Sequence, residues 1–199
     1  MSAITWPTEL RASQFMLQSN PNVRVFGSSM GGSEQPVDYL NDRWMVSLQI
    51  TARRAEHGRV REAFIASLRG MVNTVALWHM GPGRQAPAGT LRGTPTIHTD
   101  AAAGAASIVL QAAAGETLKA GDMLGAGGLL LMVSEDCTAN GSGVITVPLV
   151  NRLRTALAAA AAVTWDKPTA PFRLVGTSGV RYQPGTTDAV SLEFVEAIS

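Results

Sequence analysis

The sequence predicts a mainly β fold with one amphipathic helix, in which a β-sandwich domain carries a smaller inserted β module. The first observation is strict alternation in residues 43–51, where every second residue is apolar. The second is the same alternation in residues 190–197, close to the other end of the chain. A period of two is typical of a strand with one buried face. The apolar positions are Trp44, Val46, Leu48 and Ile50, and then Val190, Leu192 and Phe194.

The third observation is a change of composition between these strands. Residues 88–168 are rich in alanine and glycine, poor in aromatic residues, and contain several short apolar runs. We therefore predict that residues 1–87 and 169–199 form one discontinuous β domain. Residues 88–168 are predicted to form an inserted small β-barrel or sandwich. A chain of 199 residues, 46% of them apolar, is long enough to build both cores.

The first domain is predicted to open with short strands at residues 9–17 and 23–26, separated by the turn formers of residues 19–22. Residues 27–34 are glycine-rich and predict a loop.

After the strand at 43–51 the apolar spacing becomes helical, which predicts an amphipathic helix at 55–69 that ends at Gly70. The predicted apolar stripe consists of Val60, Ala63, Phe64, Leu68 and Met71. The arginines at 53, 54, 59, 61 and 69 are predicted to lie on a solvated face. A further strand is predicted at 72–79.

Residues 81–95 contain many prolines and glycines and predict a domain boundary. Within the insertion we predict strands at 107–111, 129–133 and 144–147, the last two joined as a hairpin through an Asn-Gly loop. Residues 156–163 are predicted to be a loop that leads into a strand, and residues 172–175 return to the first domain.

The bulk properties exclude several classes of function. A net charge of +1 predicts no broad attraction to nucleic acid or to acidic membranes. Cys137 is the single cysteine, so an intrachain disulfide is excluded. We expect no signal peptide and no membrane insertion, because no apolar run approaches the ~18–20 residues of a spanning helix.

One catalytic pattern is present. Residues 27–31 match G-x-S-x-G, the nucleophile elbow of serine hydrolases, with Ser29 as the nucleophile. However, the segment after it contains Pro36 and has no helical period, and too few residues precede it to supply the sheet of such an enzyme. We therefore predict a loop here and no enzymatic activity.

Metal and cofactor sites are also not predicted. The histidines at 57, 79 and 98 lack metal-binding spacing, and the residues around Cys137 lack the acidic pattern of a calcium loop. Glycines 125, 127 and 128 are followed by neither a phosphate-binding lysine nor a helix. The four tryptophans, at 6, 44, 78 and 165, are expected to be packing residues.

Four segments resemble distal tail proteins, which form the tail-tip hub of long, flexible-tailed bacteriophages. Residues 44–70 resemble the strand-and-helix segment of that family, and residues 87–95 resemble the start of its inserted module. Residues 118–154 resemble a recurrent β module with an Ala-Gly-Asp turn, and residues 172–197 resemble the family's C-terminal strands.

This resemblance implies a structural virion protein that forms a ring, commonly a hexamer, between the tail tube and the tail tip or baseplate. Its expected partners are other copies of itself, the tail tube protein and the tail-tip hub or baseplate proteins. The expected location is the tail tip of the virion, after assembly in the host cytoplasm. The β domain would be the ring-forming belt, and near-neutral charge suits a channel through which DNA slides.

Two alternatives remain open. The insertion could be a carbohydrate-binding module for host-surface glycans, although Trp165 is its one tryptophan. The less favoured alternative is a serine esterase that uses Ser29.

Overall fold

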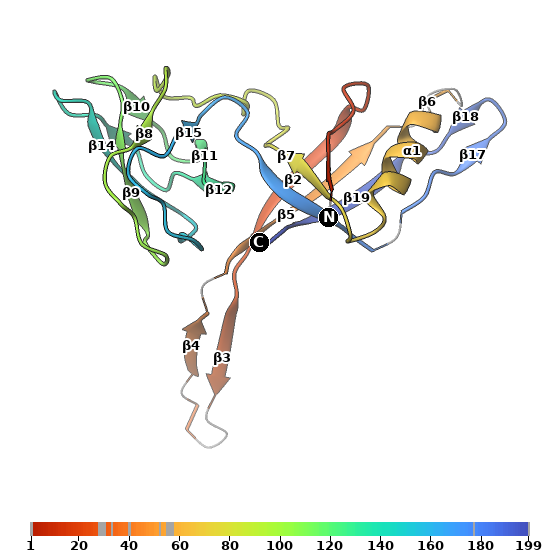
Figure 1. Ribbon diagram of the computed structural model, residues 1–199. Coiled ribbons are helices and arrows are strands. Elements are labelled where there is room, and N and C mark those ends of the chain that lie inside the picture. Colours follow the sequence, from red (N-terminus) through yellow and green to blue (C-terminus); the bar gives the residue numbers. More distant parts are fainter. Residues whose placement is uncertain are drawn as a thin grey trace. The chain divides into compact units, whose positions relative to one another are not determined.

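The computed structural model describes residues 2–27, 31–32, 34–39, 41–51, 53–54, 58–176 and 178–198. Strands account for 44% of the chain and helix for 6%, with a single helix in these ranges. The predicted mainly β fold with one helix is therefore confirmed (Figure 1).

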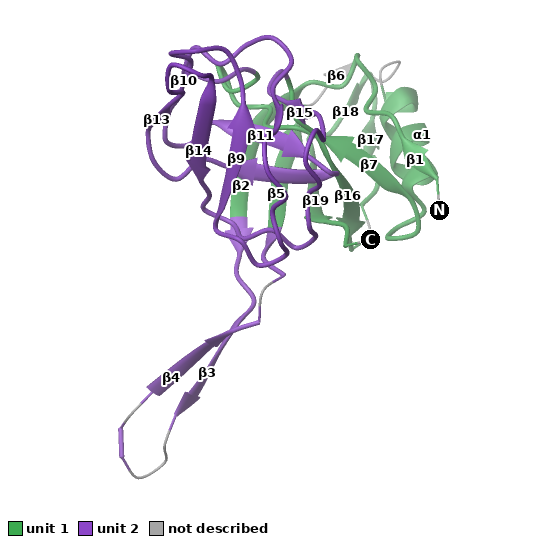
Figure 2. Cartoon of the chain, turned by 60° about the vertical axis from the view of Figure 1, so that its left-hand side comes forward, with its two compact units in different colours: residues 1–18, 44–85, 167–199 green, residues 19–43, 86–166 purple. Residues whose placement is uncertain are grey.

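The chain divides into two compact units (Figure 2). Unit 1 contains residues 1–18, 44–85 and 167–199, and unit 2 contains residues 19–43 and 86–166. This division differs from the predicted one at residues 19–43, which group with the module rather than with the discontinuous domain.

Unit 1 is built on a six-stranded sheet in which the two alternating segments of the sequence are neighbours (Figure 1). Its strands, in spatial order, are β1 (Ala3–Ile4), β7 (Thr74–Leu77), β16 (Ala170–Val175), β19 (Val190–Glu196), β5 (Arg43–Ile50) and β2 (Ala12–Asn20). β5 and β19 pair antiparallel, with Val190 opposite Ile50 and Val195 opposite Met45. β1 and β7 form a parallel pair. Strand β7 is shorter than the predicted 72–79, because the chain turns before Thr74.

One face of this sheet is buried, as the alternation predicts. The odd-even pattern of burial runs through β5, β16 and β19, so each strand presents alternate side chains to the interior. The side chains of Leu48, Leu192, Phe172 and Phe194 are at most 1% exposed. These large apolar residues form the centre of the unit 1 core.

The helix α1 (Gly58–Leu68) corrects the predicted stripe. Its buried side chains are Arg61, Phe64, Ile65 and Leu68, whereas the predicted stripe residues Val60 and Met71 are 40% and 53% exposed. The start of the predicted helix, residues 55–57, lies outside the described residues. The end agrees with the prediction, because Arg69 and Gly70 have positive φ values that leave the helical region.

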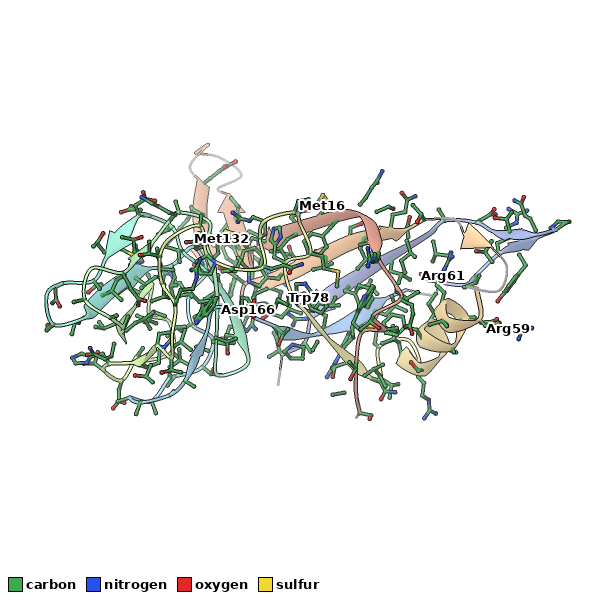
Figure 3. The ribbon with its side chains drawn as sticks, turned by 90° about the horizontal axis from the view of Figure 1, so that it is seen from above. Met16, Arg59, Arg61, Trp78, Met132 and Asp166 are labelled. Carbon is green, nitrogen blue, oxygen red and sulfur yellow. The ribbon has the colours of Figure 1, made fainter. Side chains whose placement is uncertain are left out.

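Arg61 was predicted to be solvated but is 1% exposed. Its guanidinium donates to the carbonyl oxygen of Asp188 at 2.6 Å and to Oγ1 of Thr187 at 3.0 Å. Thr187 belongs to β18 (Thr186–Thr187), and Asp188 follows it directly. This strand forms a sheet with β17 (Tyr182–Gln183) and β6 (Arg53–Arg54), which lies beside α1. In Figure 3, Arg59 points away from the chain whereas Arg61 lies between the elements. A buried charge with hydrogen-bonded partners therefore fixes α1 to β18.

Unit 2 contains three small sheets around one apolar core. The sheets are β14 (Val144–Pro148) with β9 (Ser107–Gln111) and β8 (Thr96–Ile97), then β12 (Leu129–Met132) with β11 (Met123–Ala126) and β15 (Val163–Thr164), and finally β10 (Thr117–Leu118) with β13 (Cys137–Thr138). Residues 156–163 form the predicted loop before a strand, with one bridge from Leu157 to Ala101.

The predicted hairpin between residues 129–133 and 144–147 is wrong. β12 pairs with β11, and β14 pairs with β9. The β11–β12 hairpin turns at Gly127 and Gly128, which both have positive φ values, 56° and 77°. Two such residues are what a tight two-residue hairpin turn requires, and the Gly-Gly pair supplies them at no steric cost.

Unit 2 also includes β3 (Val23–Gly27) and β4 (Glu34–Asp38), which pair antiparallel. We call these two strands the ribbon. Strand β4 falls partly in the predicted loop and partly in a segment for which no element is predicted.

Candidate interaction surface

The ribbon exposes apolar side chains on both of its faces. In an antiparallel pair, opposite residues point to the same side and successive residues alternate. Val25 is therefore on one face with its partner Pro36, and Phe26 is on the other with its partner Gln35. Val23, Val25 and Phe26 are 44%, 58% and 54% exposed. An isolated two-stranded hairpin is marginally stable in water, so this surface is typical of a segment that another surface covers.

Polar contacts hold the base of the ribbon within unit 2. The N–H of Tyr39 donates to the carbonyl oxygen of Asn22 at 3.0 Å and continues the strand pairing. A guanidinium nitrogen of Arg154 donates to the carbonyl oxygen of Asp42 at 2.7 Å, and Nε of Arg152 is 3.9 Å from a carboxylate oxygen of Asp38. These contacts are at one end, so they fix where the ribbon starts and leave its apolar residues uncovered.

A second candidate surface is a pocket in unit 1 with a volume of about 540 Å³. We call it the two-indole pocket, because Trp6 and Trp78 both line it. The other lining residues are Thr8, Leu10, Arg11, Ala12, Met80, Gln85 and Lys167. Such volumes are typical of sites that enclose a small group of atoms.

The two indoles of this pocket differ in their hydrogen bonding. Nε1 of Trp6 donates to the carbonyl oxygen of Leu10 at 2.8 Å, and its ring packs edge-on against Phe64 with a centroid separation of 5.1 Å. Nε1 of Trp78 is buried and finds no acceptor among the described residues. A buried donor without an acceptor costs about 1–3 kcal/mol, so the Trp78 side of the pocket favours an occupant that brings an oxygen atom.

The charge of the pocket is of one sign. Arg11 and Lys167 line it, and no carboxylate is among its lining residues. The pocket thus combines apolar side chains with polar and cationic ones, which favours an occupant that has an apolar group next to a carboxylate or another anion.

The predicted catalytic pattern cannot be placed in this arrangement, because Ser29 lies outside the described residues. His57 lies outside them as well. His79 is half-buried and its ring packs on Phe15 at a centroid distance of 5.0 Å. Burial, together with the charge of Arg84, lowers the pKa of His79, so this imidazole is neutral at pH 7.

The remaining candidate residues have packing or turn roles. In the described part of the chain, no three His, Cys, Asp or Glu residues are grouped as metal ligands would be. Burial and the charge of Asp136 raise the pKa of Cys137, which disfavours the reactive thiolate. The side chain of Asn140 accepts from the backbone N–H groups of Ser142 and Val144 and closes the turn after Cys137.

Trp165, the residue on which a glycan-binding module would depend, is already engaged. The guanidinium of Arg92 lies 5.0 Å from the centre of its ring, and Nε1 of Trp165 donates to the carbonyl oxygen of Gly93 at 2.8 Å. A sugar that stacks on this indole would have to compete with that cation.

The predicted strand at 23–26 agrees with β3 of the ribbon, but its partner β4 was not predicted, because Pro36 and the preceding glycines indicate a loop. A proline is nevertheless tolerated in an edge strand, where its missing N–H breaks no sheet ladder. Residues 34–39 read EQPVDY and show no period of two, so no local signal indicated a strand there.

None of the described helices has the length and apolar composition that a bilayer-spanning helix requires. No protein-family model matches the sequence, and a comparison with curated proteins finds no relative.

Proposed function

We propose that the protein is a structural virion component that assembles with copies of itself into a ring, hexameric by its resemblance to distal tail proteins, between the tail tube and the tail tip. The observation that carries the proposal is the ribbon. Its apolar residues are uncovered on both faces in the isolated chain, and burying them against neighbouring copies would remove this apolar area from water.

The resemblance in sequence supports the same conclusion from a separate direction. The segments that resemble the tail-protein family include β5, α1 and β19, the elements of unit 1 that build its sheet and helix. A chain with a sheet domain in one unit and an exposed ribbon in the other offers two different surfaces, which closed rings require of each copy.

The first test is the native mass of the purified full-length protein over a wide range of concentration. We expect a closed oligomer that negative-stain electron microscopy shows as a ring. A protein that stays monomeric at high concentration, also in the presence of its tail tube partner, would contradict the proposal.

The second test replaces the ribbon's apolar residues by charged ones. The double variant Val25→Asp with Phe26→Asp places one new carboxylate on each face of the ribbon, so we expect the oligomer to dissociate whichever face assembly buries. The matched control is Met71→Asp with Val72→Asp, two adjacent residues that are 53% and 52% exposed. Equal loss of assembly in both variants would mean that the ribbon has no special part in it.

A further inference from the structure

The two-indole pocket and one face of the ribbon have complementary chemistry. The pocket is lined by apolar side chains, by the neutral polar residues Thr8 and Gln85, by Arg11 and Lys167, and by no carboxylate. Its charged groups are thus positive only.

The ribbon has one face with the opposite character. The register places Val23, Val25 and Gly27 on this face, together with their partners Asp38, Pro36 and Glu34. Its side chains are therefore apolar or acidic, and the one ribbon arginine, Arg24, belongs to the other face with Val37 and Phe26. We call the first side the acidic face.

The two carboxylates of the acidic face differ in surroundings. Asp38 lies at the base, 3.9 Å from Nε of Arg152. Glu34 lies at the other end of β4 and is exposed. Val25 and Pro36, both exposed, lie between them. An apolar pair followed by a carboxylate is the kind of group that the two-indole pocket favours.

We propose that the two-indole pocket of one copy receives the acidic face of the ribbon from a neighbouring copy. This inference rests on the proposed self-assembly and names the surfaces that would meet. Burial of Val25 and Pro36 against the indoles supplies the apolar contact, and Glu34 lies near Arg11 and Lys167. Charges of opposite sign across such an interface set the orientation of the partners and exclude the other face of the ribbon.

A charge-reversal experiment tests the pairing in the full-length chain. The pocket variant carries Arg11→Glu with Lys167→Glu, and the ribbon variant carries Glu34→Lys with Asp38→Lys. Exposed ion pairs contribute little to stability, so loss of the long Asp38–Arg152 contact leaves the ribbon variant folded. Circular dichroism and thermal unfolding check the folding of each variant.

We expect each variant alone to lose its oligomer in native mass measurements, because each brings like charges together. An equimolar mixture should recover the wild-type mass. In a ring of alternating variants, every reversed pocket meets a reversed ribbon and every normal pocket meets a normal one. The matched control is Arg69→Glu with Arg181→Glu, which changes the net charge equally at exposed positions of unit 1 and should assemble normally.

The outcomes separate this inference from the proposed function. If the wild type forms rings and either reversed variant does so equally well, the pairing is overturned and the ring remains. If both variants dissociate and their mixture does not recover, the pairing is also overturned. A monomeric wild type overturns both.

Discussion

Asp122 connects the start of the inserted module to the turn before β11, and its removal is the most informative perturbation of unit 2. The side chain is 3% exposed, and its carboxylate accepts three backbone N–H groups. The donors are Ala88 at 2.8 Å, Gly89 at 3.2 Å and Lys119 at 2.8 Å. The substitution Asp122→Ala removes all three acceptors at once.

The expected loss follows from these contacts. A hydrogen bond to a charged group contributes about 1.5–3 kcal/mol, and a buried donor left without an acceptor costs about 1–3 kcal/mol. The Gly89 donor is buried, whereas those of Ala88 and Lys119 are partly buried and regain some hydration. We therefore expect the free energy of unfolding of the module to fall by roughly 3–5 kcal/mol. A typical domain has only about 5–15 kcal/mol in total.

The assay is amide hydrogen exchange read by mass spectrometry, combined with denaturant unfolding. Peptides that cover residues 86–95 and 117–126 should lose protection, and those of β5 and β19 should keep it. Asp122→Asn, which keeps one acceptor oxygen, should lie between wild type and Asp122→Ala. The control is Asp166→Ala, an exposed carboxylate of the same unit, for which we expect little change. Unchanged exchange at residues 86–95 in Asp122→Ala would refute the reasoning.

Three further predictions concern single residues. Arg61→Met removes the donors to Thr187 and Asp188, so we expect the free energy of unfolding to fall by about 1–3 kcal/mol per contact and amide hydrogen exchange in β17 and β18 to become faster. The exposed control Arg59→Met should stay near wild type. The pKa of His79 is lowered in the folded chain, so below the ordinary value of 6.5 the unfolded chain binds more protons, and the melting temperature of unit 1 should fall as the pH is lowered. His79→Asn should remove this part of the pH dependence, and a variant with the same pH profile as wild type would contradict the prediction. Gly89→Ala would place a Cβ in steric clash with the backbone carbonyl of Thr117, so the melting temperature of the module should fall. Gly141→Ala, with open space around it, should melt like wild type.

Alternation made the main sheet predictable. A strand with one buried face has a period of two whatever its partner, and this period identified both β5 and β19. The period does not indicate which strand pairs with which. Val144–Pro148 was assigned to the wrong neighbour, because an Asn-Gly loop indicates a local hairpin while the tertiary fold pairs this strand with β9.

The burial of Arg61 and the two-indole pocket were harder to predict, for two different physical reasons. A charged residue such as Arg61 is expected to be exposed unless hydrogen-bond acceptors for it are known. Its acceptors are on residues 187 and 188, more than a hundred positions away in the sequence, so no local pattern reveals them. The two-indole pocket combines residues from positions 6 to 167, so no local pattern describes it. The tryptophans at 6 and 78 were expected to be packing residues, and their common pocket depends on the fold.

The junction between the two units suggests an order of folding during synthesis. The N–H of Lys167 donates to the carbonyl oxygen of Gln85 at 2.7 Å, so the two chain segments that lead into and out of residues 86–166 meet at one point. A ribosome completes this stretch well before β19, the strand that β5 needs as its neighbour. Residues 86–166 can therefore fold before β19 is available to pair with β5. Once folded, they would keep Gln85 and Lys167 close together. A graft that replaces residues 86–166 by a short turn between Gln85 and Lys167 should accordingly leave the six-stranded sheet intact.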